Sequence, residues 1–93
     1  MLRFEWAPRK AVLNLRKHRI SFDEAASVFG DLVSLTISDP DSSLDETRFI
    51  TLGRSNVGRL LAVVHTERDD KIRLISARRA SPRERANYEE TIN

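Results

Sequence analysis

The segment RLLAVVHTERDDKIRLISARRAS, residues 59–81, holds two of the most apolar stretches of the chain. Residues 60–64 are all aliphatic, residues 72–76 include three aliphatic side chains, and Asp69 and Asp70 between the two stretches are of a residue type that favours turns. Short apolar runs bounded by turn residues are typical of strands in the middle of a sheet, with much of both faces covered. The segment therefore predicts two neighbouring antiparallel strands around which the rest of the fold is arranged.

Three arginines interrupt the second of these strands. Alternate side chains of a strand share a face, so Ile72 and Leu74 are expected in the core and Arg73 on the opposite face, joined by Arg79 if no bulge intervenes. Arg78 and Arg79 end the strand beside the start of a predicted helix, where anions bind favourably. The arginines could therefore bind phosphate. The alternative, slightly favoured by the pattern alone, is surface ion pairing with acids near in sequence, namely Glu67, Asp70 or Glu84.

The segments on either side predict further strands and helices. Strands are expected at residues 3–6, 31–39 and 47–55, and residues 56–58 form a hairpin turn into the strand at 59–68. Helices are expected over three segments, each introduced by a proline or a capping residue: 8–18, 21–30 and 82–90. The order is β-α-α-β-β-β-β-α. It predicts an α+β class, with an antiparallel sheet and helices packed on one face, in a single domain over residues 1–93.

The first predicted helix is amphipathic. Ala11, Val12 and Leu15, with Ile20 beyond the helix, give an apolar face that is expected to be buried. A second face is polar and mostly basic and consists of Lys10, Asn14, Lys17 and His18.

Charge is distributed unevenly along the chain. The net charge is only +2, yet residues 7–20 hold five Lys or Arg and no acid, and 13 of the 16 cationic residues are arginine, the side chain best suited to phosphate. The absence of cysteine excludes disulfides and thiolate zinc sites and fits a reducing compartment. No leader segment and no run long enough to cross a bilayer is found, so a cytoplasmic protein is expected.

Few motifs carry chemistry. The sequence has no metal-binding histidine pair and no glycine loop for a nucleotide, so no metal and no cofactor are expected. His18 and His65 could exchange a proton near neutral pH, although a dipole role for His18 and a packing role for His65 are the simpler interpretations. The most economical enzymatic hypothesis is metal-free cleavage of RNA, in which cations stabilise the phosphate and Lys17, His18 or Tyr88 assists.

The ordered segments KHRISFDEA (17–25), DETRFITLGRS (45–55) and IRLISARRA (72–80) resemble the BrnT toxins of bacterial type II toxin–antitoxin systems. The resemblance extends over most of the chain, with departures at Ala7 and at Arg19, where an acid and a glycine are usual. It implies a RelE-like ribonuclease fold and an endoribonuclease that inhibits translation without a metal or cofactor.

The resemblance also implies partners. A BrnA-like antitoxin with a ribbon-helix-helix region would neutralise the toxin, and the complex would bind operator DNA and repress its own operon. A dimer of the toxin and a toxin–antitoxin heterotetramer are the two assemblies left open. The expected catalytic residues are Lys17, His18, Arg73 and Arg79, and the expected RNA-binding residues are Lys10, Arg78 and Tyr88. The alternative is a module without turnover that uses the same basic face to bind RNA, DNA or a protein partner.

Overall fold

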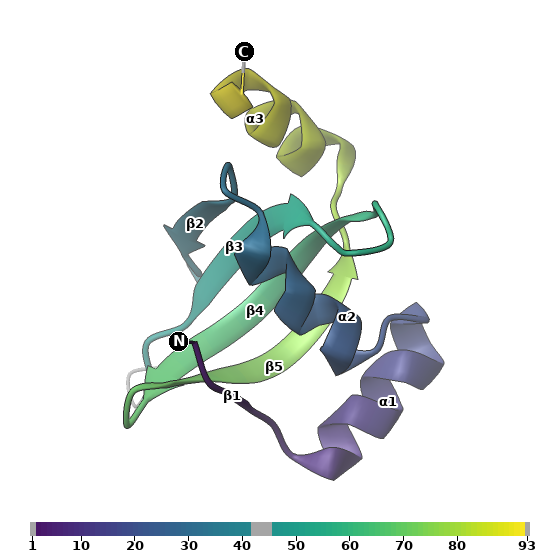
Figure 1. Cartoon of the computed structure of the whole chain (residues 1–93), viewed down its shortest axis with the longest axis vertical. Coiled ribbons are helices and arrows are strands. Elements are labelled where there is room, and N and C mark those ends of the chain that lie inside the picture. Colours follow the sequence, from purple (N-terminus) through teal and green to yellow (C-terminus); the bar gives the residue numbers. More distant parts are fainter. Residues whose placement is uncertain (1, 42–45, 93) are drawn as a thin grey trace.

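The two apolar segments form the longest strands of a five-stranded sheet (Figure 1). The computed structural model describes residues 2–41 and 46–92, so part of the acidic loop at 39–46 lies outside the described residues. Across the sheet the order is β1-β5-β4-β3-β2. The elements in chain order are β1 (Phe4–Glu5), α1 (Pro8–His18), α2 (Phe22–Ser27) with a 3-10 turn (Val28–Gly30), β2 (Leu35–Ser38), β3 (Phe49–Arg54), β4 (Leu60–Arg68), β5 (Lys71–Arg79) and α3 (Pro82–Ile92).

The predicted α+β class and element order are confirmed. The sheet is antiparallel except at one edge, where the short β1 pairs in parallel with β5. β2 is shorter than predicted because residues 32–33 form a turn, in which the Asp31 carboxylate accepts a hydrogen bond from the Val33 N–H. Asp69 and Asp70 form the predicted turn, and both have positive φ, which matches the twist of the flanking strands. Within the described ranges no helix is long and apolar enough to cross a membrane.

The sheet carries a core on each face. One face packs on α2 through Leu61, Val63 and Leu74, with Phe22 among the helix residues that cover them. The other face buries Leu60, Ala62 and their neighbours against Tyr88 of α3. The prediction of helices on one face therefore holds for α2, whereas α1 lies along the free edge of β5 with Ala11 reaching the first core. α3 packs on the opposite face and stands at the far end from α1 (Figure 1).

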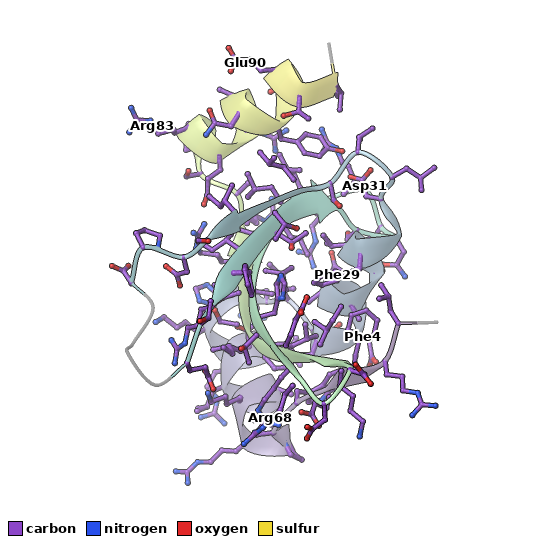
Figure 2. The ribbon with its side chains drawn as sticks, turned by 90° about the vertical axis from the view of Figure 1, so that its left-hand side faces the viewer. Phe4, Phe29, Asp31, Arg68, Arg83 and Glu90 are labelled. Carbon is purple, nitrogen blue, oxygen red and sulfur yellow. The ribbon has the colours of Figure 1, made fainter. Side chains whose placement is uncertain are left out.

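Two aromatic contacts of Phe29 add to the first core. The rings of Phe4 and Phe29 lie 5.3 Å apart between centroids, which joins β1 to the 3-10 turn after α2 (Figure 2). Phe29 also meets the imidazole of His65 edge-on at 4.9 Å. The Phe29 ring therefore helps to bury His65 of β4.

Asn14 is the buried residue of α1, contrary to the predicted helix faces. Its amide donates to the carbonyls of Ala77 and Ile20 at 2.9 Å each, and its Oδ1 accepts from the Ala77 N–H at 2.9 Å. The side chain therefore takes the place of a neighbouring strand at the free edge of β5. Val12 and Leu15, expected in the core, are 56% and 50% exposed, because this pairing turns the Asn14 side of α1 toward the sheet.

A β-bulge in β5 changes which arginines share a face. Val64 pairs with Ser76 but the next residue, His65, pairs with Leu74, so Ile75 is the extra residue. The inserted residue shifts the alternation, and Arg79 consequently lies on the face that packs against α2. The condition under which Arg79 was expected beside Arg73 is therefore not met.

The corner after α1 keeps the geometry that glycine favours. Arg19 has φ 61° and ψ 30°, a left-handed conformation, and its N–H donates to the Leu15 carbonyl at 2.9 Å. Its own carbonyl accepts from the Arg59 guanidinium at 3.2 Å. Arginine in place of the usual glycine thus leaves the corner intact, at the cost of a strained backbone.

We expect Asn14→Ala to destabilise the protein by about 2–4 kcal/mol, because it leaves the buried N–H and C=O of Ala77 without partners. Urea unfolding followed by circular dichroism measures the change. The control is Asn87→Ala on the exposed side of α3, which should change stability by less than about 0.5 kcal/mol. Equal stability of the two variants would contradict the structural role assigned to Asn14.

His65 lies in the core at the end of a chain of hydroxyls. Its Nε2 is 2.8 Å from the Thr51 hydroxyl, which is 2.7 Å from that of Thr36, while its buried Nδ1 has no partner among the described residues. Burial lowers the pKa of His65 to about 4. The imidazole is therefore neutral in the folded protein at neutral pH, which favours the packing role over a catalytic one.

Stability should fall as the pH drops from about 6.5 to about 4. In that window the unfolded chain protonates His65 and the folded chain does not, which removes on the order of 3 kcal/mol of unfolding free energy by pH 4. Urea unfolding at several pH values measures this slope. His65→Gln should flatten it between pH 6.5 and 5, above the range in which Glu24, Asp31 and Glu84, whose pKa values are lowered by hydrogen bonds, begin to titrate. An unchanged slope in the variant would remove His65 as its source.

Candidate functional site

A groove runs between α1 and the bulged part of β5. Its volume is about 580 Å³, and it is lined by residues of these two elements, namely Lys10, Leu13, Asn14, Arg16, Lys17, His18, Ile75 and Ser76. The hydrogen bonds between Asn14 and Ala77 fix α1 against β5 and so set the width of the groove. The bulge places two successive residues, Ile75 and Ser76, on its floor.

The groove is cationic and contains no acid. Lys10 and Lys17 are exposed and seven residues apart, so they lie on one side of α1 two turns from each other. Neither lysine, nor the half-buried His18, forms an ion pair or side-chain hydrogen bond within the part of the chain that the structure describes. Cationic groups without an acidic partner beside an apolar floor suit a ligand that combines negative charge with flat apolar surfaces.

Arg73 and Arg78 lie on the other face of the sheet from α2, on either side of Ser76 along β5. Arg73 is half-buried and 3.5 Å from Glu5. Arg78 forms two parallel bonds with Glu84, at 2.6 and 3.0 Å, and the Arg78 guanidinium lowers the pKa of that carboxyl. Arg78 thus forms a surface ion pair with Glu84, one of the three acids expected as partners. Arg73 forms a longer ion pair with Glu5, which was not among those acids.

Arg79 is exposed and lies apart from the other two arginines. Its charge contributes to the lowered pKa of Glu24, after the larger effect of the hydrogen bond from Arg59. Arg78 therefore interacts with Glu84, whereas the charge of Arg79 acts on Glu24. The structure does not bring Arg79 together with Arg73.

Tyr88 is buried, and its hydroxyl donates to Asp31 at 2.6 Å. Asp31 also accepts the backbone N–H of Arg54, whose guanidinium lies 5.9 Å from the centre of the Tyr88 ring. Burial and the bond to Asp31 raise the pKa of Tyr88. These contacts favour a role in anchoring α3, and the RNA-binding role of Tyr88 stays a prediction.

Five residues of the groove were not among the predicted site residues, namely Leu13, Asn14, Arg16, Ile75 and Ser76. Asn14 also positions the groove, through its bonds to β5. Asn14 could have been recognised in the sequence, because it stands alone between apolar residues of a predicted helix. Asparagine is unfavourable inside a helix unless its amide has hydrogen-bond partners. Ser76 offered no such signal, since its placement depends on the bulge. Among the described residues no cluster of three or more His, Asp or Glu could hold a metal ion.

Comparison with known proteins places the chain in a family. Residues 6–84 match the sequence model of the ribonuclease toxin BrnT of type II toxin–antitoxin systems. This chain belongs to the BrnT toxin family. A crystal structure of the Brucella abortus ribonuclease toxin BrnT, at 1.1 Å resolution, shares the fold, with a TM-score of 0.63 and 21% identity over 87% of this chain and 99% of that one. A search of curated protein sequences finds no match.

The family assignment confirms the resemblance seen in the sequence. BrnT proteins are ribonuclease toxins of type II systems, in which the antitoxin is a protein, so RNA as a substrate and a protein antitoxin as a partner follow from membership. The shared fold with the Brucella toxin supports the predicted architecture.

Tyr88→Phe separates the two roles of this tyrosine. We expect it to destabilise the protein by about 1–3 kcal/mol through loss of the bond to Asp31, and to leave growth inhibition intact at a temperature where the variant is folded. Thermal unfolding and a growth assay in an inducible bacterial strain measure both effects. Unchanged stability with lost toxicity would instead support contact of the hydroxyl with RNA.

Proposed function

We propose that this chain is an endoribonuclease that cleaves RNA without a metal ion and thereby inhibits translation. The observation that carries the proposal is the groove between α1 and β5, in which Lys10, Lys17 and His18 face an apolar floor with no acid among the lining residues. A polyanion with flat bases fits such a surface. The family assignment supplies the reaction class.

The proposed reaction is attack of a ribose 2′-hydroxyl on the adjacent phosphorus. The 2′-oxygen forms a new P–O bond, a base accepts its proton, and the bond to the 5′-oxygen breaks as an acid protonates that oxygen. The products are a 2′,3′-cyclic phosphate and a 5′-hydroxyl. Lys17 and His18 are the candidates for proton transfer. Arg73 is the candidate for stabilising the negative charge on the phosphate, because it lies on the same side of β5 as Ser76, which lines the groove.

Arg78 and Lys10 are proposed to hold the RNA backbone on either side of the scissile bond. Arg78 uses Nη1 and Nη2 for Glu84 and Nη1 also for the Arg79 carbonyl, so its Nε–H and the second N–H of Nη2 are left for phosphate, and Lys10 lies two turns along α1 from Lys17. Arg79 is proposed as a contact at the exposed end of β5, although it lies on the other face.

Regulation is proposed to follow the type II pattern. A BrnA-like ribbon-helix-helix antitoxin would neutralise the toxin, and the complex would bind operator DNA and repress its own operon. The protein-antitoxin part of this proposal rests on the family description.

The purified protein should cut RNA in the presence of EDTA and leave cyclic phosphate ends. Lys17→Ala and Arg73→Ala should each reduce the cleavage rate by about 100-fold or more, because each removes a proton-transfer or charge-stabilising group. Lys17→Arg keeps the charge, so retained RNA binding with lost cleavage would assign proton transfer to Lys17. Gel-based cleavage and anisotropy with labelled RNA measure the two properties.

Arg83→Ala is the matched control, because Arg83 is exposed and points outward from α3, far from the groove (Figure 2). It should cleave within about twofold of the wild type. RNA that is bound but never cut, with or without ribosomes, would support the binding module without turnover. Wild-type cleavage by a folded Arg73→Ala variant would remove that residue from the site.

A further inference from the structure

α1 exposes more aliphatic surface than its contacts with the sheet require. Val12, Leu13 and Leu15 are 56%, 51% and 50% exposed, while the helix is held by Asn14 and the half-buried Ala11. Leu13 lies in the groove already described. Val12 and Leu15 lie on another side of the helix, where the groove does not reach.

These two aliphatics belong to a stripe with two arginines. Val12, Leu15 and Arg16 follow the i, i+3, i+4 spacing, which places side chains on one side of a helix. Arg19 follows α1 at the corner, and all four residues line a single hollow of about 700 Å³. A smaller hollow on the far side of Val12 and Leu15 reaches Trp6 and Phe22 and includes one acid, Asp23. Val12 and Leu15 therefore form a ridge between two hollows. Helices pack against each other by fitting the ridges of one into the grooves of the other, so this surface suits a second helix.

The charged residues of α1 around the ridge are all positive. Residues 7–20 contain five Lys or Arg and no acid, and neither Arg16 nor the side chain of Arg19 has an ion pair within the described part of the chain. A second copy of this chain would bring the same cations against themselves, which opposes self-association through this side. RNA would match the charge but not the aliphatic ridge.

We propose that this α1 stripe (Val12, Leu15, Arg16 and Arg19) is the docking surface for an acidic amphipathic helix of the antitoxin. The proposal rests on the proposed function for its partner. The helix would pack apolar side chains beside Val12 and Leu15 and set carboxylates against Arg16 and Arg19, a helix-in-groove contact of the kind that peptide-recognition surfaces use.

The position of the stripe explains how docking would neutralise the enzyme. Arg16 lines both the hollow of the stripe and the groove that contains Lys17 and His18. A helix whose carboxylates engage Arg16 stands at the rim of the groove and brings negative charge to the entrance that RNA phosphates must pass. Inhibition therefore follows from occupancy of the stripe without any rearrangement of the toxin.

The test uses the purified toxin and the full-length antitoxin of the same operon, with affinity measured by biolayer interferometry at about 150 mM salt. Val12→Ser together with Leu15→Ser should weaken binding at least about tenfold, because the ridge is lost while the core is untouched. Leu32→Ser together with Val33→Ser is the matched control, since these residues are 100% and 43% exposed in the turn before β2. The control should bind within about twofold of the wild type.

Charge is tested separately. Arg16→Glu should weaken binding at least about tenfold, and Arg83→Glu on α3 should not, with circular dichroism confirming that each variant is folded. Antitoxin that binds the Val12/Leu15 variant as tightly as the wild type overturns the proposal. So does loss confined to the Leu32/Val33 variant, which would place the partner at β2, and so does a toxin dimer that the Val12/Leu15 variant dissociates.

Growth inhibition by the toxin alone distinguishes this proposal from the proposed function. The Val12/Leu15 variant should inhibit growth like the wild type and should escape neutralisation when the antitoxin is co-expressed. A wild-type toxin that neither inhibits growth nor cuts RNA contradicts the ribonuclease proposal, while the binding measurements still decide the docking surface. A wild-type toxin that does not bind the antitoxin overturns the docking proposal alone.

Discussion

The pairing of Asn14 with Ala77 is the interaction on which the arrangement of the basic residues depends. A sheet edge offers unpaired N–H and C=O groups, and here a single side-chain amide satisfies one such pair in the second half of β5. The same amide donates to Ile20 and so ties the end of the α1 corner to the sheet. Because the anchor is a polar side chain instead of an apolar stripe, the rest of α1 is left free to carry other surfaces.

α1 consequently has two sides with different surroundings. The side that holds the sheet through Asn14 also presents Lys10 and Lys17 to the groove, and another side presents an aliphatic ridge with cations at its end. The groove and the ridge share Arg16. In a toxin that must both act on RNA and be stopped by a protein, an element of 11 residues thus lies at the junction of the two proposed activities.

The elements and their order could be predicted from the sequence because apolar period, turn residues and capping boxes agree with one another. The capping box of Ser81 and Glu84, for example, forms as predicted, with the Glu84 N–H donating to the Ser81 hydroxyl at 3.1 Å and the Ser81 N–H donating to the Glu84 carboxylate at 2.8 Å. At Ser21 only the first of these bonds forms, because the Glu24 carboxylate accepts from Arg59 instead. The buried side of α1 could not be predicted in this way. Periodicity counts Val12 and Leu15 as core and Asn14 as surface, and only the partner groups on a distant strand reverse that assignment.

The candidate site was predictable in part, for a similar reason. Lys10, Lys17 and His18 lie together because they are spaced along one helix, a relation that the sequence contains. The arginines of β5 depend on strand pairing, and no local pattern reveals an extra residue in one of two paired strands. Tyr88 likewise looked available for RNA, since its bond to Asp31 joins residues 57 positions apart.

The bulge at Ile75 has a consequence for how such proteins change over time. Removal of this residue would restore simple alternation and leave Arg73 and Arg78 together on one face, because Leu74 already pairs with His65 and Ser76 with Val64. A deletion that the bulge did not absorb would instead carry the side chains on one side of it to the opposite face. Relatives that lack one residue at this point can therefore keep their positive charges on the same sides of the sheet, and an alignment pairs equivalent arginines only if its gap falls at Ile75.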